Sequence, residues 1–426
     1  MSAAAAGVVA TVSARRLLAG IHEDRAVSLR EHLARHGALE IARGATLSQL
    51  VEASGLQGRG GAAFPVARKL AAVRARRGRP VVVVNATEGE PLSGKDKVLL
   101  RHVPHLVLDG AVALAAELRT ADVVVAVSRN AHDERSALVA AVNERKTHRV
   151  DRRADINVVT VPDRFVAGEE TALVQHLNGA PAQPTLVPPR PFERGVDGRP
   201  TLVQNAETVA HVALIARHGP SWFRRVGTPA EPGSALFTVS GSVRRPGVYE
   251  AGLGIPLVEL IELAGGLAKT PQAVLVGGYF GTWFSAAAAR TLTLDDACLL
   301  PRGGSLGARA IAVLADDACG VVETARVARY LAEQSAGQCG PCMHGLAAIA
   351  GALERAARPE AVDERQRIAR WCAQVDGRGA CRHPDGAVRF VASALDVFAT
   401  EFEAHCVHRR CTSDGALVLP IPRGRR

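Results

Sequence analysis

Val81-Val82-Val83-Val84-Asn85 is a run of β-branched residues that ends in an amide. The run has no polar alternation, which is typical of a strand buried on both faces of a sheet. Similar runs cover Asp122 to Ser128 and Asp155 to Pro162. Helical patterns fill the intervals, over Pro104 to Leu118 and Ala131 to Lys146. This alternation predicts an α/β domain with a mostly parallel sheet covered on both faces.

The pattern changes twice further along the chain. Ala235 to Gly241 and Gly247 to Glu250 read as a β-hairpin, and Pro256 to Ala264 reads as a helix. Asp317 to His405 has an almost entirely helical pattern, interrupted by two loops that carry cysteines. We therefore expect a small β-containing unit and then a helical bundle of four helices.

Composition excludes some classes of protein. The 426 residues are 47% hydrophobic and 22% charged, which is enough for two or three cores. No apolar run reaches the length of a membrane span, and Met1 to Val12 lacks the basic region that precedes the apolar part of a signal peptide. We expect a cytoplasmic protein that meets a membrane only through a partner.

The chain is basic, with a formal net charge of +10. Its arginines are spread out and only 4% of the residues are aromatic, so the clustered basic stripe of a nucleic-acid-binding protein is missing. The charge either serves general solubility or forms a docking surface for an acidic, ferredoxin-like protein.

Three cysteines are spaced for a metal centre. Cys339 and Cys342 share one tight loop, and Cys381 follows some forty residues later. Such spacing indicates metal or redox chemistry in an intracellular protein. A cubane iron–sulfur cluster usually takes four cysteines, three of them at C-x2-C-x2-C, and the first position of that pattern is Ala336 here.

Three interpretations of the missing ligand stay open. A fourth ligand comes from elsewhere in the chain, the cluster is a three-iron type that needs only three cysteines, or the site has decayed to ordinary thiols or a zinc site. The candidates for a distant fourth ligand are His344, Cys372, Cys406 and Cys411.

The remaining cysteines have plainer interpretations. Cys298 and Cys319 are expected to be small buried residues. A separate zinc site is allowed by four residues that stand close together in the sequence, His405, Cys406, His408 and Cys411.

Five motifs stand in one order along residues 45 to 405. They are Gly58-Arg59-Gly60-Gly61-Ala62-Ala63-Phe64-Pro65, Asn85-Ala86-Thr87-Glu88-Gly89-Glu90-Pro91, Gly168-Glu169-Glu170-Thr171-Ala172-Leu173, Gln204-Asn205-Ala206-Glu207-Thr208 and the cysteine loop from Glu333 to Cys342. In this order they resemble the NADH-binding flavoprotein subunits of respiratory complex I and of NAD-linked hydrogenases and formate dehydrogenases. The departures within the motifs suggest a divergent, stand-alone member.

The resemblance implies a domain organisation. It predicts an N-terminal helical segment or tail (1–44), an FMN-binding α/β domain (45–232), a small β-grasp, SLBB-like domain (233–312), a helical iron–sulfur-binding domain (313–410) and a C-terminal tail (411–426). It also identifies Cys339, Cys342 and Cys381 as ligands of the cluster, which is of the 4Fe-4S type with a non-standard fourth ligand or of the 3Fe-4S type.

A flavin site follows from the first four motifs. The glycines of the first motif allow a close approach of backbone to ligand, Arg59 and Lys69 suit a phosphate, and Asn85 ends a buried strand, where open α/β sheets bind ligands. The expected cofactor-binding residues are Gly58, Arg59, Gly60, Gly61, Phe64, Lys69, Asn85, Glu88, Glu90, Gly168, Glu169, Glu170 and Asn205. The alternative is that the four glutamates are solvated loop charges. Thr87 replaces an aspartate of the relatives.

The nucleotide site departs most from the family pattern. Val187 and Arg190 stand where relatives have a lysine and a phenylalanine, and Leu70-Ala71-Ala72 replaces a Trp-Ser-Phe element. Of the aromatic rings only Phe64 is retained. Each lost stacking platform removes about 1–3 kcal/mol of binding. NAD(H) therefore stays one possible donor, beside NADPH gripped by Arg190 or an electron-donating protein.

The expected function is FMN-dependent electron transfer. A reduced nucleotide or another donor reduces the flavin, which passes electrons to the iron–sulfur centre and on to a ferredoxin-like protein or a membrane reductase. The alternatives are a docking protein that has lost its cofactors, and a flavin reductase without a cluster.

Overall fold

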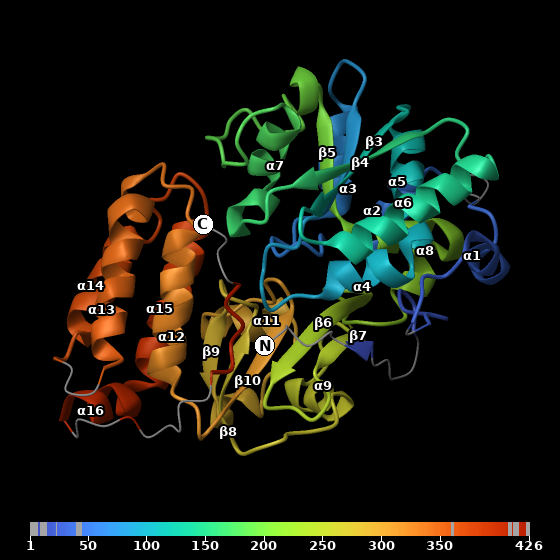
Figure 1. Cartoon of the computed structure of the whole chain (residues 1–426). Coiled ribbons are helices and arrows are strands. Elements are labelled where there is room, and N and C mark those ends of the chain that lie inside the picture. Colours follow the sequence, from blue (N-terminus) through green and yellow to red (C-terminus); the bar gives the residue numbers. More distant parts are fainter. Residues whose placement is uncertain are drawn as a thin grey trace.

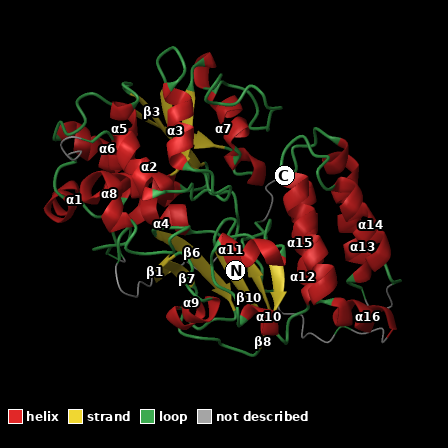
Figure 2. Cartoon of the chain, turned by 180° about the vertical axis from the view of Figure 1, so that it is seen from behind, coloured by secondary structure: helices red, strands yellow, loops and turns green. Residues whose placement is uncertain are grey.

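Two β-sheets and a bundle of helices build the protein (Figure 1). The computed structural model describes residues 7–8, 15–22, 24–39, 45–358, 362–407, 411 and 417–422. Figure 2 shows the same three parts from behind, with the helical bundle beside the larger sheet and the α/β part above that sheet.

The first sheet is parallel throughout. Its order is β4-β3-β2-β5, made of β2 (Val81–Ala86), β3 (Asp122–Ser128), β4 (Asp155–Val161) and β5 (Thr201–Asn205). Val82 and Val84 pack into a large apolar cluster on one face, whereas Val81 and Val83 pack into a smaller one on the other. Since successive side chains of a strand point to opposite faces, the unbroken valine run is explained by burial on both sides. The predicted parallel sheet is confirmed.

The helices of this domain follow the predicted alternation. They are α1 (Leu29–His36), α2 (Leu47–Ser54), α3 (Val66–Arg74), α4 (Lys95–His102), α5 (Pro104–Glu117), α6 (His132–Thr147), α7 (Glu170–Leu177) and α8 (Ala206–Phe223), with short 3-10 turns η1 (Phe165–Gly168) and η2 (Val196–Gly198). Ser28 and Thr46 begin α1 and α2 with capping boxes. α7 and η1 cover the face of the smaller cluster, and most of the other helices cover the opposite face.

Helix α5 is apolar on nearly every side because it is buried between neighbours. It packs against α8 at Gly110, where a Cβ atom would lie 1.9 Å from the carbonyl oxygen of Val209. Among the described residues no single helix is long and apolar enough to span a membrane. The bent pair α4 and α5, at 97°, passes that test only by combined length and composition.

The second sheet has six strands in the order β1-β7-β6-β10-β8-β9. They are β1 (Gly7–Val8), β6 (Ser234–Gly241), β7 (Gly247–Gly252), β8 (Pro271–Val276), β9 (Thr282–Ser285) and β10 (Ala310–Ala315). β6 and β7 form the predicted antiparallel hairpin. The predicted helix is α9 (Leu257–Leu263), which ends at Gly265 and Gly266, both with positive φ. Short helical turns complete the domain, α10 (Ala286–Ala289), α11 (Asp296–Leu299) and η3 (Leu300–Arg302).

The C-terminal part is the predicted helical bundle. It contains α12 (Gly320–Glu333), a π-helical turn η4 (Pro341–Leu346), α13 (Ala347–Ala356), α14 (Arg365–Val375), α15 (His383–Val397) and α16 (Ala399–Val407). α12 and α14 run toward the same end of the bundle, so the two cysteine loops that follow them meet there, while α16 lies across the opposite end (Figure 1).

The three parts meet at η1. The Phe165 ring lies 4.7 Å from the ring of Phe280, in the second sheet domain, and 5.7 Å from that of His383, in the bundle. The backbone N–H of Phe165 donates to the Gln334 side chain at 3.0 Å. The edge of the first domain that carries Gly168 is therefore held directly against the cysteine loops.

Candidate flavin and iron–sulfur sites

Two asparagines mark the carboxyl edge of the parallel sheet. Asn85 and Asn205 are paired in register at the ends of β2 and β5. The Asn85 amide donates to the carbonyl oxygen of Gly168 at 2.8 Å, and its oxygen accepts from the Thr87 hydroxyl at 2.8 Å. Asn205 caps α8 by accepting from the backbone N–H of Glu207 at 3.1 Å. This edge is where open parallel sheets bind ligands.

The glycine loop between α2 and α3 approaches Asn205 closely. A Cβ atom on Gly60 would lie 3.3 Å from the Cβ of Asn205, and Gly61 has a φ of 102°. Ala63, in the same loop, also has positive φ although it is not glycine. Strained backbone of this kind gathers at binding sites. The loop brings its backbone N–H groups to the sheet edge, as the sequence predicted.

Arg59 has a different role from the expected one. Its side chain is 1% exposed and donates to the carbonyl oxygens of Pro232 and Ser234 at 3.2 and 3.1 Å. Burial lowers the pKa of its guanidinium, and the neighbouring Arg309 adds to that effect. The hypothesis that this guanidinium pairs with a flavin phosphate is therefore corrected, because its donors join the first domain to the start of the second sheet.

Two of the four candidate glutamates are helix caps. Glu88 accepts from the backbone N–H groups of Asp96 and Lys97, both at 3.0 Å, at the start of α4. Its backbone has a φ of 43°. Glu169 accepts from the N–H groups of Thr171 and Ala172 at 2.9 and 3.0 Å at the start of α7. Carboxylates are favoured there because they satisfy donors that the first helical turn leaves open.

The other two glutamates have partners as well. Glu90 accepts from the N–H groups of Leu92 at 3.1 Å and of Tyr279 at 2.8 Å, and burial raises its pKa to about 7. Glu170 forms an ion pair with Lys69. None of the four glutamates is therefore a simple solvated charge, and the ion pair holds Lys69 beside the motif Gly168-Glu169-Glu170.

Sequence reasoning missed Lys95. This lysine is 3% exposed and lies 2.8 Å from Asp96, 3.2 Å from Glu207 and 3.1 Å from the side-chain oxygen of Asn205. Burial lowers its pKa, but the carboxylates of Asp96 and Glu207 outweigh burial and leave the pKa raised. Buried paired charges are rare outside functional sites. The signal was the Lys-Asp pair directly after the Glu88 and Glu90 loop.

These residues fit a flavin mononucleotide. A Cβ atom on Gly168 would lie 2.7 Å from the Thr87 hydroxyl oxygen, so glycine keeps the second loop close to the sheet edge. Backbone N–H groups, two asparagine amides and the cations of Lys69 and Lys95 supply the donors that a phosphate and a polar ring need.

The cysteine loops bring three thiols together. Burial and the neighbouring thiols of Cys339 and Cys381 raise the pKa of Cys342 to about 12, and the Ser335 hydroxyl hydrogen-bonds to it. Burial also raises the pKa of Cys381, and the nearby charges of Glu169 and Cys339 add to this. At Cys339, burial is outweighed by backbone N–H groups, so its pKa is lowered. Mutually destabilised thiolates of this kind suit a metal centre, whose positive charge relieves them.

The structure removes two of the candidates for a fourth ligand. Cys411 lies with Cys319 at the start of α12, and Cys406 lies on α16 beside Arg365. The 14 residues of α12 span about 21 Å, which separates that end of the bundle from the loop that carries Ala336. Cys372 and His344 remain, the first buried in α14 and the second exposed on η4.

The loop that lacks the cysteine touches the flavin domain. Arg164 donates to the carbonyl oxygen of Ser335 at 3.0 Å, and Gln183 donates to that of Ala336 at 3.4 Å. Together with the charge interaction between Glu169 and Cys381, these contacts place the candidate flavin edge next to the thiols.

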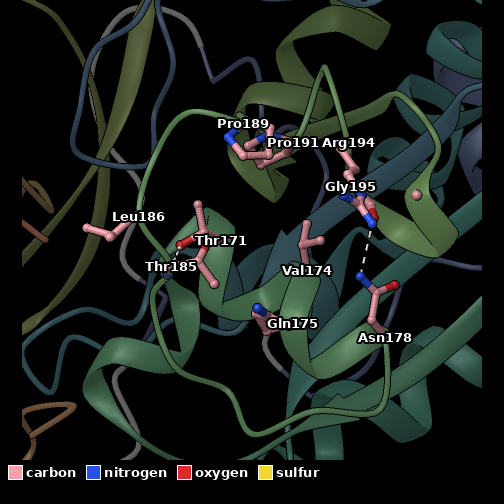
Figure 3. A pocket seen from close by; sticks show the side chains of 11 residues that line it. Thr171, Val174, Gln175, Asn178, Thr185, Leu186, Pro189, Pro191, Arg194 and Gly195 are labelled. Carbon is pink, nitrogen blue, oxygen red and sulfur yellow. Dashed lines mark hydrogen bonds between the residues drawn. The ribbon is translucent and has the colours of Figure 1, made fainter. Parts of the chain in front are cut away.

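The residues that depart from the family's nucleotide site line an open surface. Phe64 is 52% exposed and Val187 is 43% exposed, and Arg190 is exposed as well. Next to them, a cavity of about 380 Å³ lies between α7 and the proline-rich segment (Figure 3). Its lining residues are Thr171, Val174, Gln175, Asn178, Thr185, Leu186, Pro189, Pro191, Arg194, Gly195 and Gly198.

A parallel sheet with a glycine loop at its carboxyl edge, joined to a small mixed sheet and to a bundle with three grouped thiols, defines a flavin and iron–sulfur electron-transfer protein. Three family models match the chain in this order. They are the Nuo51 FMN-binding domain over residues 51–214, the SLBB domain over 236–278, and the NADH-ubiquinone oxidoreductase-F iron-sulfur binding region over 323–405.

Whole-chain relatives agree with these matches. The second of the NADH-quinone oxidoreductase F subunits of Rhizobium meliloti is 32% identical over 85% of this chain and 89% of the relative. The corresponding F protein of Rhodobacter capsulatus is 31% identical over 86% of this chain and 89% of the relative. The protein belongs to the family of NADH-quinone oxidoreductase F subunits, which confirms the resemblance.

A solved structure shares the fold. In the NAD⁺-reducing [NiFe]-hydrogenase in the H2-reduced state, one chain superposes with a TM-score of 0.76 at 29% identity. The match covers 84% of this chain and 62% of the hydrogenase chain.

Proposed function

We propose that the protein is an FMN-dependent oxidoreductase that takes electrons from a reduced nucleotide and delivers them to an iron–sulfur centre on its bundle. Its relatives are NADH-quinone oxidoreductase subunits. The observation that carries the proposal is the three-way contact at η1, where Phe165 and Arg164 hold the flavin-side loop against the cysteine loop.

Each group of residues has a proposed role. The loop Gly58 to Gly61 and Gly168 hold a flavin by their backbone, and Lys69 and Lys95 neutralise its phosphate. Asn85 and Asn205 orient its polar ring, and Glu90 and Glu170 shape the donor's place. FMN supplies the step from two-electron to one-electron transfer. The cluster is held by Cys339, Cys342 and Cys381.

The domain boundaries belong to the proposal too. We assign the flavin domain to residues 45–232, the β-grasp domain to 233–312 and the iron–sulfur domain to 313–410. The matched family regions, 51–214, 236–278 and 323–405, support this division.

We further propose a ferredoxin-like protein as electron acceptor, or a membrane reductase reached through such a partner. Relatives are subunits of larger enzymes, and a net charge of +10 favours an acidic partner. The cytoplasm is the proposed location, since closely grouped thiols stay reduced there.

The donor is tested by restoring the family's nucleotide contacts. In the double variant Val187→Lys, Arg190→Phe, the regained charge and stacking should lower the Kd for NADH at least tenfold, which is about 1.4 kcal/mol. The measurement is anaerobic titration of flavin reduction with NADH and with NADPH.

The matched control is Leu186→Lys with Arg190 unchanged, which adds the same charge one residue away, at a side chain that is 74% exposed. It should leave the Kd unchanged. An unaltered Kd in the double variant would show that the nucleotide does not bind along this segment.

A further inference from the structure

Two cysteines and a histidine far apart in the sequence meet at the end of the bundle opposite the cysteine loops. Ligand atoms of Cys319, His405 and Cys411 all lie within 4.8 Å of one another. Cys319 is 3% exposed and His405 is 1% exposed, while Cys411 is half-buried. The sequence had suggested a zinc site from neighbouring residues of the C-terminal segment and a plain core role for Cys319. Instead, the start of α12 supplies one thiol, and Cys406 is not in the group.

The histidine is oriented as a ligand. Its Nδ1 lies 3.1 Å from the carbonyl oxygen of Ala356, and a carbonyl only accepts, so Nδ1 carries the proton. The lone pair is then on Nε2, which lies 3.5 Å from the sulfur of Cys319. Metal-binding histidines are held in the same way, with the second nitrogen donating to a carbonyl or carboxylate.

The Cys319 thiol is placed to become a thiolate ligand. It caps α12, where its sulfur accepts from the backbone N–H of Val322 at 3.4 Å, and a helix N-terminus favours negative charge. Burial, together with the nearby Glu401 and Cys411, nevertheless raises the pKa of Cys319. A bound cation removes that conflict, because it compensates the negative charges of the whole group.

An oxygen ligand is also at hand. The Glu401 side chain interacts with Cys319 and is fixed by the backbone N–H of Gly320, which donates to it at 2.7 Å, and by Gln272. Two sulfurs, one nitrogen and one oxygen form a donor set that zinc accepts. Ligands 2.0–2.3 Å from zinc are roughly 3–4 Å apart in a tetrahedron, which agrees with the observed spacing.

We propose that Cys319, His405 and Cys411 bind a divalent zinc ion, with Glu401 or water as the fourth ligand. The ion joins the C-terminal segment to the base of α12 and α16. The segment beyond Cys411 then follows α12: the N–H groups of Val418 and Leu419 donate to Glu323 at 2.7 and 3.3 Å. This site is separate from the cluster, since α12 spans about 21 Å between them.

The test is metal analysis of the full-length protein purified without oxygen, with zinc, iron and sulfide counted per chain. Wild type should hold one zinc beside its iron. Cys411→Ser should lower zinc at least tenfold and leave iron unchanged. Cys406→Ser, one residue from His405 but outside the group, should keep both metals, and Cys381→Ser should lose iron and keep zinc.

Two readouts on folded wild-type protein guard against a variant that misfolds. Cobalt(II) added to metal-stripped protein should give the thiolate-to-cobalt charge-transfer band, and zinc should raise the Tm of wild type but not of Cys411→Ser. The proposal fails if zinc follows Cys381 instead of Cys411, if stripped protein takes up no zinc or cobalt, or if mass spectrometry shows a disulfide between Cys319 and Cys411.

Discussion

Ala336 occupies the position where the cysteine pattern lacks its first ligand, and it lies in the loop that touches the flavin domain. Ala336→Cys should supply the ligand and increase the iron content per chain and, several-fold, the lifetime of the cluster in air. Iron and sulfide analysis with electron paramagnetic resonance measures this.

The matched control for that variant is Gln338→Cys, which adds a thiol to the same loop at an exposed position. It should change neither quantity. If both variants behave alike, the site does not hold a cluster that lacks one ligand.

Glu90 gives a pH dependence whose sign follows from its raised pKa. A carboxyl with a folded-state pKa of about 7 and an ordinary pKa of 4.5 binds its proton more tightly in the folded state. The resulting stability is complete below about pH 4.5 and is lost as the pH rises to about 7. Glu90→Gln should remove this slope, which amounts to up to about 3 kcal/mol.

Thermal unfolding between pH 5 and 8 checks this prediction. Glu52→Gln, exposed on α2, serves as the control and should keep the wild-type slope. Parallel curves for wild type and Glu90→Gln would show that Glu90 stays ionised throughout the range.

Which residues gather at the site was predictable, but their contacts were not. Glycines and asparagines of the motifs do lie at one sheet edge, because strand ends and loops are fixed by local patterns. The guanidinium of Arg59 and the cap role of Glu88 depend on segments elsewhere in the sequence, Pro232 for the first and the start of α4 for the second.

At the scale of elements, two helical glycines make opposite predictions. Gly110→Ala places a Cβ atom 1.9 Å from the Val209 carbonyl oxygen and should push α5 from α8. Overpacking of this kind costs about 1–3 kcal/mol or more, so the Tm should fall by several degrees. Gly351→Ala in α13 meets only ordinary contacts and should stabilise by about 0.5–1 kcal/mol.

Tryptophan fluorescence during thermal unfolding distinguishes the two variants. Equal effects would mean that the α5 and α8 contact adapts without cost. The boundaries of these elements were predicted within one or two residues, because buried β-branched runs and helix periodicity are local signals. The π-helical turn η4 was not, since it follows from how Cys342 and its neighbours pack.

At the scale of the whole molecule, the order of three modules was predictable from motif order. The junction at Phe165 was not, because no sequence pattern tells which loops of separate domains touch. The same holds for Cys319, which pairs with residues more than eighty positions away. Both sites arise from the arrangement of the bundle beside the sheets.

The visible spectrum of anaerobically purified protein, taken with flavin, iron and sulfide content before and after NADH, tests the central claim most directly. The account predicts flavin bands and a broad iron–sulfur shoulder, both bleached by a reduced nucleotide. Bleaching by NADPH or another donor alone would assign the changes at Val187 and Arg190 to donor choice. Colourless protein, or flavin without iron and sulfide, would contradict electron transfer from flavin to a cluster.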